Sequence, residues 1–152
     1  MAITPLLPRP ELEAGSRTGQ QYDKLRALVA ELERRGLPEE PARAVSREVE
    51  TLNGHEGTGK AFARQLQKAW NAVLKVVREG PGWVPRNYHR NTWMALGLAV
   101  FGVPLGVTFG LSLGSMAFLG IGFPIGLAIG LALGAGLDQK AAEQGKQLDV
   151  DY

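Results

Sequence analysis

The sequence contains no cysteine, and its central part contains no charge. Without cysteine, disulfides and thiolate metal sites are excluded, although the redox compartment stays open. The only histidines, His55 and His89, have no cluster of carboxylates beside them, so we expect no metal site. The 46 residues from Thr92 to Leu137 include no Asp, Glu, Lys, Arg or His. An uncharged run of this length is typical of membrane-spanning helices.

The polar parts of the chain carry no pattern that indicates an enzyme. The segment 54–60 fits the first seven positions of a phosphate-binding loop, but Ala61 stands where Ser or Thr would hold magnesium. The residues before it have a helical period, whereas such a loop follows a buried strand. We find no Ser/His/Asp set or paired carboxylates, and therefore expect no catalysis, cofactor or bound nucleotide.

Charge is distributed without a strongly basic region. Residues 1–91 hold 15 Lys and Arg against 11 Asp and Glu, a net charge of +4, and residues 138–152 hold two against four, a net charge of −2. The cations alternate with acids along helices, which is typical of solvated faces. We expect no nucleic-acid partner.

The first half of the chain predicts a flexible arm followed by a three-helix module. Residues 1–18 carry three prolines and are expected to be extended and mobile. Apolar positions three and four apart then predict amphipathic helices over about 19–35, 40–53 and 58–79, with Thr58 as a plausible N-cap. The stripe on the third helix either packs the core of this module or docks a protein: Phe62, Leu66, Trp70, Val73 and Val77.

Residues 80–92 predict a juxtamembrane linker. Gly80-Pro81-Gly82 ends the third helix, and aromatic rings then alternate with cations. Trp and Tyr gather at membrane–water boundaries, and Arg pairs with lipid phosphate. The expected interface residues are Trp83, Arg86, Tyr88, Arg90 and Trp93.

The uncharged block, residues 93–137, predicts a transmembrane hairpin. One helix of 46 residues would be about 69 Å long, against a hydrocarbon core of about 30 Å. Two spans fit, over about 93–115 and 120–137. The block also repeats at an offset of 20 residues, since 101–114 and 121–134 are identical at seven of 14 positions.

Glycines at a spacing of four predict how the spans pack. Small residues let helix backbones approach closely in lipid, where dispersion rather than burial from water drives association. A tight turn around residues 117–119 would place glycines of the two antiparallel spans level with each other: 102 with 134, 106 with 130, 110 with 126 and 114 with 122. The expected packing residues are Gly102, Gly106, Gly110, Gly114, Gly122, Gly126, Gly130 and Gly134. Whether these faces meet within one chain or between copies stays open.

The other special residues of the block have structural interpretations. Pro104 inside the first span predicts a kink, whereas Pro124 falls in the first turn of the second. The hydroxyls of Thr108 and Ser112 are expected to bond back to the carbonyls of Pro104 and Thr108 respectively, four residues earlier. The functional alternative is that Thr108 and Ser112 line a pore.

Flanking charges predict the orientation. Arg86 and Arg90 precede the first span and Lys140 follows the second, so both termini are expected in the cytoplasm. Residues 138–152 are expected to form a polar tail. The N-terminus lacks a basic region followed by an apolar one, so the apolar block itself is expected to direct insertion.

The stretch 122–140, Gly-Phe-Pro-Ile-Gly-Leu-Ala-Ile-Gly-Leu-Ala-Leu-Gly-Ala-Gly-Leu-Asp-Gln-Lys, resembles small bacterial two-span membrane proteins with glycine zippers and no characterised activity. The resemblance covers residues 93–148 and implies a helical hairpin in a bacterial inner membrane. Rotary ATP synthase ring subunits are also glycine-rich hairpins, but they need a carboxylate in the second span, and residues 118–137 have none.

Together these patterns predict an all-α protein, in which cytoplasmic amphipathic helices precede a transmembrane hairpin with glycine-zipper packing. The first functional hypothesis is a non-enzymatic scaffold, anchor or accessory subunit. Its partners would be the bilayer and either a second copy or another membrane protein. The alternative is an oligomeric pore or a membrane-disrupting effector of the colicin type. An all-apolar lumen tends to exclude water, which weighs against the pore.

Overall fold

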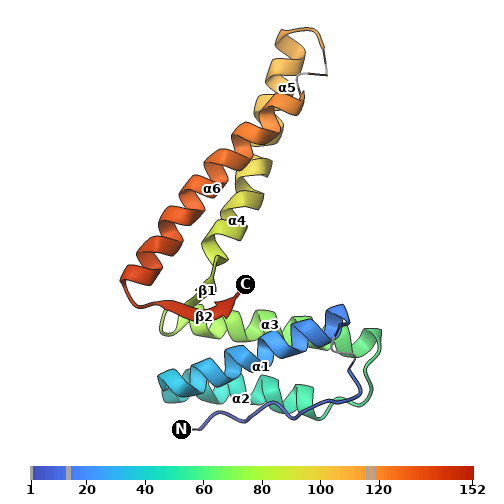
Figure 1. Cartoon of the computed structure of the whole chain (residues 1–152), viewed down its shortest axis with the longest axis vertical. Helices are drawn as coiled ribbons and strands as arrows, with labels where there is room; N and C mark the ends of the chain where they lie inside the picture. The colour runs from blue at the N-terminus through green and yellow to red at the C-terminus, as the bar shows by residue number, and fades with distance from the viewer. Residues whose placement is uncertain (1, 13–14, 116, 118) are drawn as a thin grey trace. The chain divides into compact units, whose positions relative to one another are not determined.

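The structure, a computed structural model, describes residues 2–12, 15–115, 117 and 119–152. The chain divides into two compact units (Figure 1). The first, the N-terminal unit, comprises Met1–Val84 and Leu148–Val150. The second, the hairpin unit, comprises Pro85–Gln147 and Asp151–Tyr152.

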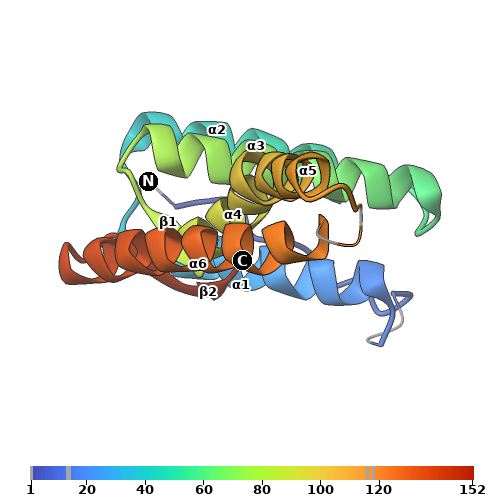
Figure 2. The same cartoon turned by 90° about the horizontal axis from the view of Figure 1, so that it is seen from above.

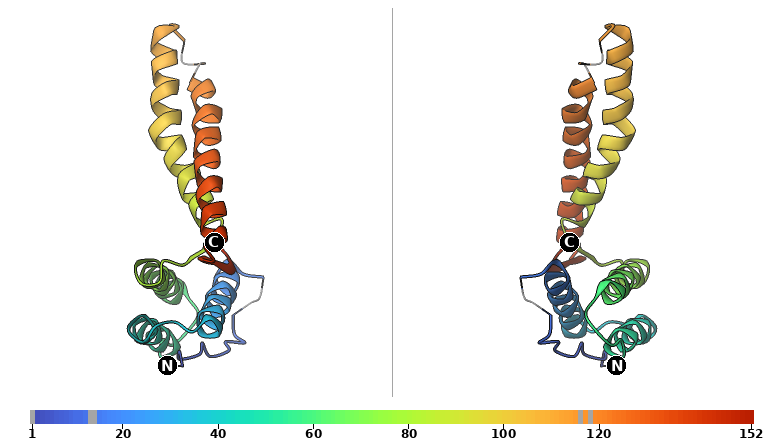
Figure 3. Two further views of the ribbon diagram at one scale, coloured as in Figure 1. Left: turned by 90° about the vertical axis from the view of Figure 1, so that its left-hand side faces the viewer. Right: turned by 90° about the vertical axis from the view of Figure 1, so that its right-hand side faces the viewer.

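The N-terminal unit contains three helices, α1 (Arg17–Arg35), α2 (Glu39–Asn53) and α3 (Lys60–Glu79). Figure 3 looks nearly along the three helices, and Figure 2 shows α2 and α3 lying lengthwise beside each other. Ser16 caps α1, because its hydroxyl accepts a hydrogen bond from the Gly19 N–H at 3.0 Å. Gly36, with φ of 74°, ends the helix. The three predicted helices are confirmed with boundaries shifted by up to two residues.

The start of α3 differs from the prediction. The helix begins at Lys60 with Gly59 at the N-cap position, so Thr58 does not cap it. In the loop between α2 and α3, Gly57 adopts a φ of 81°. Glycine reaches this left-handed region without steric cost, which lets the chain reverse tightly. The phosphate-loop-like segment is therefore a helix stop followed by a glycine turn.

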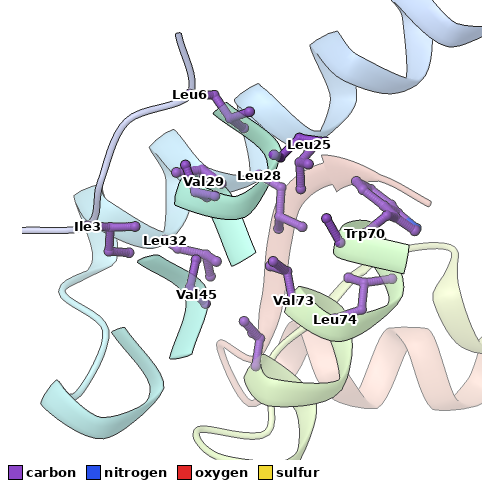
Figure 4. Close-up of a cluster of buried hydrophobic side chains, with 14 of the residues drawn as sticks. Ile3, Leu6, Leu25, Leu28, Val29, Leu32, Val45, Trp70, Val73 and Leu74 are labelled. Carbon is purple, nitrogen blue, oxygen red and sulfur yellow. The ribbon is translucent and has the colours of Figure 1, made fainter. Parts of the chain in front are cut away.

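The core of the N-terminal unit forms where the apolar stripes of the three helices meet (Figure 4). The stripe of α3, which sequence offered as a docking surface, lies in this core. Phe62 in this stripe is fully buried, and the centre of the Tyr22 ring lies 6.0 Å from that of the Phe62 ring. Core packing is thus the correct interpretation of this stripe: Phe62, Leu66, Trp70, Val73 and Val77.

Residues 2–9, here called the arm, are not a flexible extension as predicted. Ile3 and Leu6 are buried in the core, beside α1 residues including Val29 and Leu32 (Figure 4). The guanidinium of Arg9 lies 4.5 Å from the centre of the Phe62 ring. It also donates hydrogen bonds to carbonyls at the end of α2, including that of Leu52 at 3.0 Å. The last carbonyls of a helix have no N–H partner within the helix and can accept further hydrogen bonds, although that of Leu52 also accepts the N–H of His55 at 3.2 Å.

The segment predicted as a polar tail is largely structured. Helix α6 (Leu119–Glu143) continues past the apolar block, and strand β2 (Gln147–Asp151) then pairs with β1 (Val84–Arg86). Strand alternation buries Leu148 and Val150 in the core of the N-terminal unit, whereas Asp149 is exposed. The chain is therefore mostly helical, but the all-α prediction is wrong at these two strands.

One buried acid lies in the N-terminal unit. Glu31 accepts hydrogen bonds from Arg34 at 2.8 Å and from Arg35 at 2.7 Å. Burial alone would raise the pKa of Glu31, but the hydrogen bonds and the positive charges of the two arginines outweigh it and hold the pKa below its ordinary value. The charged form of Glu31 is therefore favoured by folding.

The hairpin unit consists of two long helical segments that pack on each other. The first comprises α4 (Tyr88–Gly97), a π-helical turn η1 (Leu98–Gly102) and α5 (Val103–Ser112), and the second is α6. Figures 1 and 3 show the two segments side by side. Tyr88–Ser112 and Gly120–Glu143 are each long and apolar enough to cross a membrane. The linker predicted over 80–92 is thus shorter, because the helix already begins at Tyr88.

Candidate functional site

The contact surface between the two helical segments is the candidate functional site, and glycine backbones come closest there. A methyl group added at Gly126 would lie 2.5 Å from the Cα atom of Gly102 and 2.6 Å from the carbonyl oxygen of Gly97. One added at Gly122 would lie 2.7 Å from the Cα atom of Gly106. Carbon atoms in contact are normally 3.5–4.0 Å apart, so only glycine fits at these positions.

The same close approach continues to the base of the hairpin. A methyl group at Gly130 would lie 3.0 Å from the Cα atom of Met94, and one at Gly134 would lie 2.5 Å from the Cα atom of Arg90. The residue facing Gly134, Arg90, carries a side chain, whereas Gly130 also lies against Gly97, whose added methyl group would be 2.7 Å from the Gly130 Cα atom. Close approach therefore requires glycine on α6 alone only at Gly134, and on both helices further along.

The observed register differs from the predicted pairing of glycines. Gly122 faces Gly102 and Gly106 rather than Gly114. The cause is Gly114, which is exposed, has a φ of 69° and lies beyond the end of α5 at Ser112. It therefore helps to terminate the helix instead of packing. The other seven predicted glycines are buried, and the predicted turn at 117–119 includes residue 118, which lies outside the described residues.

Gly97 belongs to the contact surface but was missed from the sequence. It lies five residues before Gly102, outside the spacing of four. The π-helical turn accounts for this spacing, because the N–H of Val103 bonds to the carbonyl of Leu98, five residues earlier. The extra residue keeps Gly97 and Gly102 on the same face. The turn directly precedes Pro104, where sequence predicted a kink.

The base of the hairpin is joined by a buried carboxylate. Asp138 of α6 accepts hydrogen bonds from the backbone N–H groups of His89 at 3.0 Å and Arg90 at 2.9 Å. These N–H groups are in the first turn of α4, where no partner exists within the helix. Asn87, at the N-cap position with φ of 59°, makes no side-chain capping bond. Asp138 therefore caps α4 from the other helix, where a negative charge is also favoured by the helix dipole.

Most of the predicted interface residues surround this base. Tyr88, Arg90 and Trp93 lie in the first two turns of α4, and Arg86 ends β1. Tyr88 also packs edge-on against Tyr152, with ring centres 5.0 Å apart.

Trp83 is the exception among the predicted interface residues. It packs on the core of the N-terminal unit, and the Arg35 guanidinium lies 5.6 Å from the centre of its ring. Its side chain is partly buried there, so it is not grouped with the other four residues. The composition of residues 80–92 predicted that Trp83 lies at the membrane–water boundary. Its ring is instead buried in part against the apolar core of the N-terminal unit.

Thr108 is a polar residue within the apolar part of the hairpin. The hydroxyl of Thr108 donates to the carbonyl oxygen of Pro104 at 2.8 Å, which confirms the structural interpretation of this residue. Among the described residues, no three His, Asp or Glu side chains come together in a way that could hold a metal ion. The chemistry that this surface supports is packing between helices.

The outer faces of both helical segments are apolar and exposed. Large aliphatic and aromatic side chains are exposed between Met94 and Leu113 in the first segment and between Ile121 and Leu137 in the second. They include Val100, Val107, Phe109, Leu111, Ile121, Phe123, Ile125 and Leu133. Soluble monomers rarely expose continuous apolar surface on this scale.

Comparison with protein-family models, with curated proteins and with solved structures finds no match to this chain. The resemblance to bacterial glycine-zipper proteins therefore stays a prediction.

Proposed function

We propose that this chain is a small, non-enzymatic integral membrane protein of a bacterial inner membrane, which serves as a scaffold, an anchor or an accessory subunit. The observation that carries the proposal is that the two faces of the hairpin differ. The helices contact each other through glycine backbone atoms, as at Gly122 and Gly126, whereas their large apolar side chains are exposed on the outer face. A hairpin in water would gain by burying its large side chains, whereas in lipid they are already solvated.

In this proposal the hairpin packs as a glycine zipper. Lipid tails are as apolar as leucine, so helix association depends on dispersion and on close backbone approach. The approach at Gly97, Gly102 and Gly126 supports this mode of packing within one chain. The exposed outer face would contact lipid, a second copy or another membrane protein.

The proposed orientation places both termini in the cytoplasm. Arg86, Arg90 and Lys140 all lie near the base of the hairpin, and 113–118 at its other end carry no charge. Asp138 and the N-terminus of α4 meet at that base, which supports a common membrane boundary for the two spans. The N-terminal unit would then be displayed at the cytoplasmic surface.

Single-cysteine labelling tests insertion and orientation, because the chain has no cysteine of its own. Ser115→Cys, between the spans, is expected to react with a membrane-impermeant maleimide in intact spheroplasts. Gln144→Cys, an exposed site after α6, is expected to react only after lysis. Both proteins should remain in the membrane pellet after alkaline carbonate extraction. Recovery in the soluble fraction would refute the membrane assignment, and reversed labelling would refute the orientation.

A flux assay separates the anchor from the pore. The Thr108 hydroxyl is already bonded to the backbone, which supports a passive hairpin. Purified protein in liposomes loaded with a fluorescent ion indicator is expected to give no flux above empty liposomes at high protein density. Steady flux that rises with protein density would replace the anchor proposal with the pore.

A further inference from the structure

Helix α3 carries a strongly unequal charge. Its 20 residues include five Lys or Arg and a single acid, Glu79, at the last position. The other two helices of the N-terminal unit mix their charges, since α1 has five cations against three acids and α2 has two against four. The prediction that cations alternate with acids along the helices is therefore wrong for α3.

The five cations of α3 share one face of the helix. At about 100° per residue, they fall within about 80° of its circumference, opposite the apolar residues that pack the core. All five are exposed, and the face extends about 27 Å along the helix. We call this surface the basic face: Lys60, Arg64, Lys68, Lys75 and Arg78.

The centre of the basic face is not neutralised by acids. Among the residues that the structure describes, Arg64, Lys68 and Lys75 form no ion pair. Asn71 lies between them on the same face and is exposed and uncharged. Like charges repel, so a partner that supplies negative charge would lower the electrostatic free energy of this surface.

The apolar side of α3 is not available to such a partner. Leu66, Trp70 and Val73 are buried in the core of the N-terminal unit. An interfacial amphipathic helix binds a bilayer by inserting apolar side chains as well as by charge. The basic face can attract a negatively charged surface through its charge alone.

The place of α3 in the chain favours a membrane as the partner. Three residues, 85–87, join Val84 of the N-terminal unit to Tyr88, where α4 begins. A chain of this length spans at most about 14 Å. Under the proposed function, this short tether keeps the N-terminal unit at a high effective concentration of lipid headgroups. Clusters of about four to eight Lys or Arg beside a membrane span are typical of binding to anionic lipid.

We propose that the basic face of α3 docks on anionic lipid headgroups of the membrane that holds the hairpin. The inference rests on the proposed function for the existence of that membrane. Each cation near such a surface strengthens binding about fivefold, so the three central cations together contribute about 100-fold. Salt weakens the docking, because the screening length falls from about 10 Å at 0.1 M to about 3 Å at 1 M.

A fluorophore on the basic face tests the docking in the full chain. Asn71→Cys lies on this face and introduces the only cysteine, which carries the label. The protein is reconstituted in liposomes of neutral lipid, and in liposomes that also contain phosphatidylglycerol. Both contain a lipid with a nitroxide quencher on its headgroup. At low salt we expect at least twofold stronger quenching in the anionic liposomes, and this excess is expected to disappear in about 1 M salt.

A control probe and two charge variants make the result specific to the basic face. The control probe, Ala27→Cys, is an exposed site on α1, and its quenching is expected to depend little on lipid charge. The first variant neutralises the three central cations and is expected to lose the excess quenching at position 71: Arg64→Gln, Lys68→Gln and Lys75→Gln. The second removes the same charge from three exposed sites of α1 and is expected to keep the excess: Arg17→Gln, Lys24→Gln and Arg26→Gln. Circular dichroism verifies that both variants retain the helix content of the parent.

The proposal is overturned if position 71 is quenched equally in the two kinds of liposome. It is also overturned if both charge variants lose the excess to the same extent, because total charge rather than the basic face would then be responsible. Single-stranded DNA that binds the parent in neutral liposomes but not the first variant, with no response to anionic lipid, would assign the basic face to nucleic acid instead.

Carbonate extraction of the same liposomes separates this inference from the proposed function. Equal quenching in a protein that resists extraction refutes the docking alone. A protein that is extracted, yet shows the excess quenching before extraction, keeps the docking and loses the membrane-spanning hairpin.

Discussion

Gly126→Ala is the sharpest perturbation of the contact between the two helical segments. The new methyl group would lie 2.5 Å from the Cα atom of Gly102 and 2.6 Å from the carbonyl oxygen of Gly97. Both neighbours are backbone atoms, so no side chain can rotate away. The helices must therefore separate locally by about 1 Å to restore normal contact distances.

The cost of that separation follows from dispersion. A pair of heavy atoms at optimal distance gains about 0.1–0.2 kcal/mol, and a gap of 0.5–1 Å loses a quarter to a half of it. If about 40 atom pairs are affected, as many as a single buried leucine makes, the loss is about 1–4 kcal/mol. Alanine favours a helix over glycine by up to about 1 kcal/mol in water, which offsets part of the loss. With the full offset, we expect a net destabilisation of about 0–3 kcal/mol.

Gly136→Ala is the matched control, because it makes the same chemical change on the same helix with no atom within 4 Å of the new methyl group. It is expected to leave stability unchanged or to raise it slightly. Both variants and the parent are unfolded reversibly in mixed micelles of a mild detergent and dodecyl sulfate, with helix content followed by circular dichroism. If Gly126→Ala and Gly136→Ala have the same unfolding free energy, the close-packed contact surface is wrong.

Three further predictions concern the cap, the buried acid and the C-terminal strand. Asp138→Ala leaves two backbone N–H groups unpaired and is expected to cost about 1–3 kcal/mol, with faster hydrogen exchange at His89 and Arg90; unchanged exchange there would refute the cap. Folding lowers the pKa of Glu31, so its ionised carboxylate stabilises the folded state fully at a pH above the ordinary pKa of Glu. This stabilisation is lost as the pH falls through the pKa of Glu31 in the folded state. Glu31→Gln is therefore expected to make the unfolding free energy depend less steeply on pH in this acidic range. An identical slope in the Gln variant would refute that role. Leu148→Ala is expected to cost about 2–5 kcal/mol in thermal or denaturant unfolding of the N-terminal unit, and a cost below about 0.5 kcal/mol would show that β2 does not complete the core.

The elements with a strong local pattern could be predicted from the sequence. The apolar stripes of α1, α2 and α3 repeat every three to four residues, and turn residues such as Gly36 mark their ends. The length and composition of the uncharged block likewise predicted two helices able to cross a membrane. Each of these features depends on residues that are close together in the sequence.

The register of the hairpin could not be predicted, because it depends on where each helix ends. Gly114 continues the spacing of four but adopts a left-handed conformation beyond α5, and Gly97 interrupts the spacing but packs. The cap by Asp138 joins residues 48 and 49 positions apart, and no local pattern marks such a pair. The two strands are short, and β2 is identifiable only by the alternation around Leu148 and Val150.

The position of β2 has a consequence for biosynthesis. Leu148 and Val150 belong to the core of the N-terminal unit, yet both spans are translated between them and Val84. At about 5–20 residues per second, the 64 residues from Val84 to Leu148 take roughly 3–13 s to synthesise. During that interval the helical bundle on the ribosome has an open apolar face that only later residues can close. Under the proposed membrane function, the hairpin would reach the insertion machinery before the core of the N-terminal unit is complete.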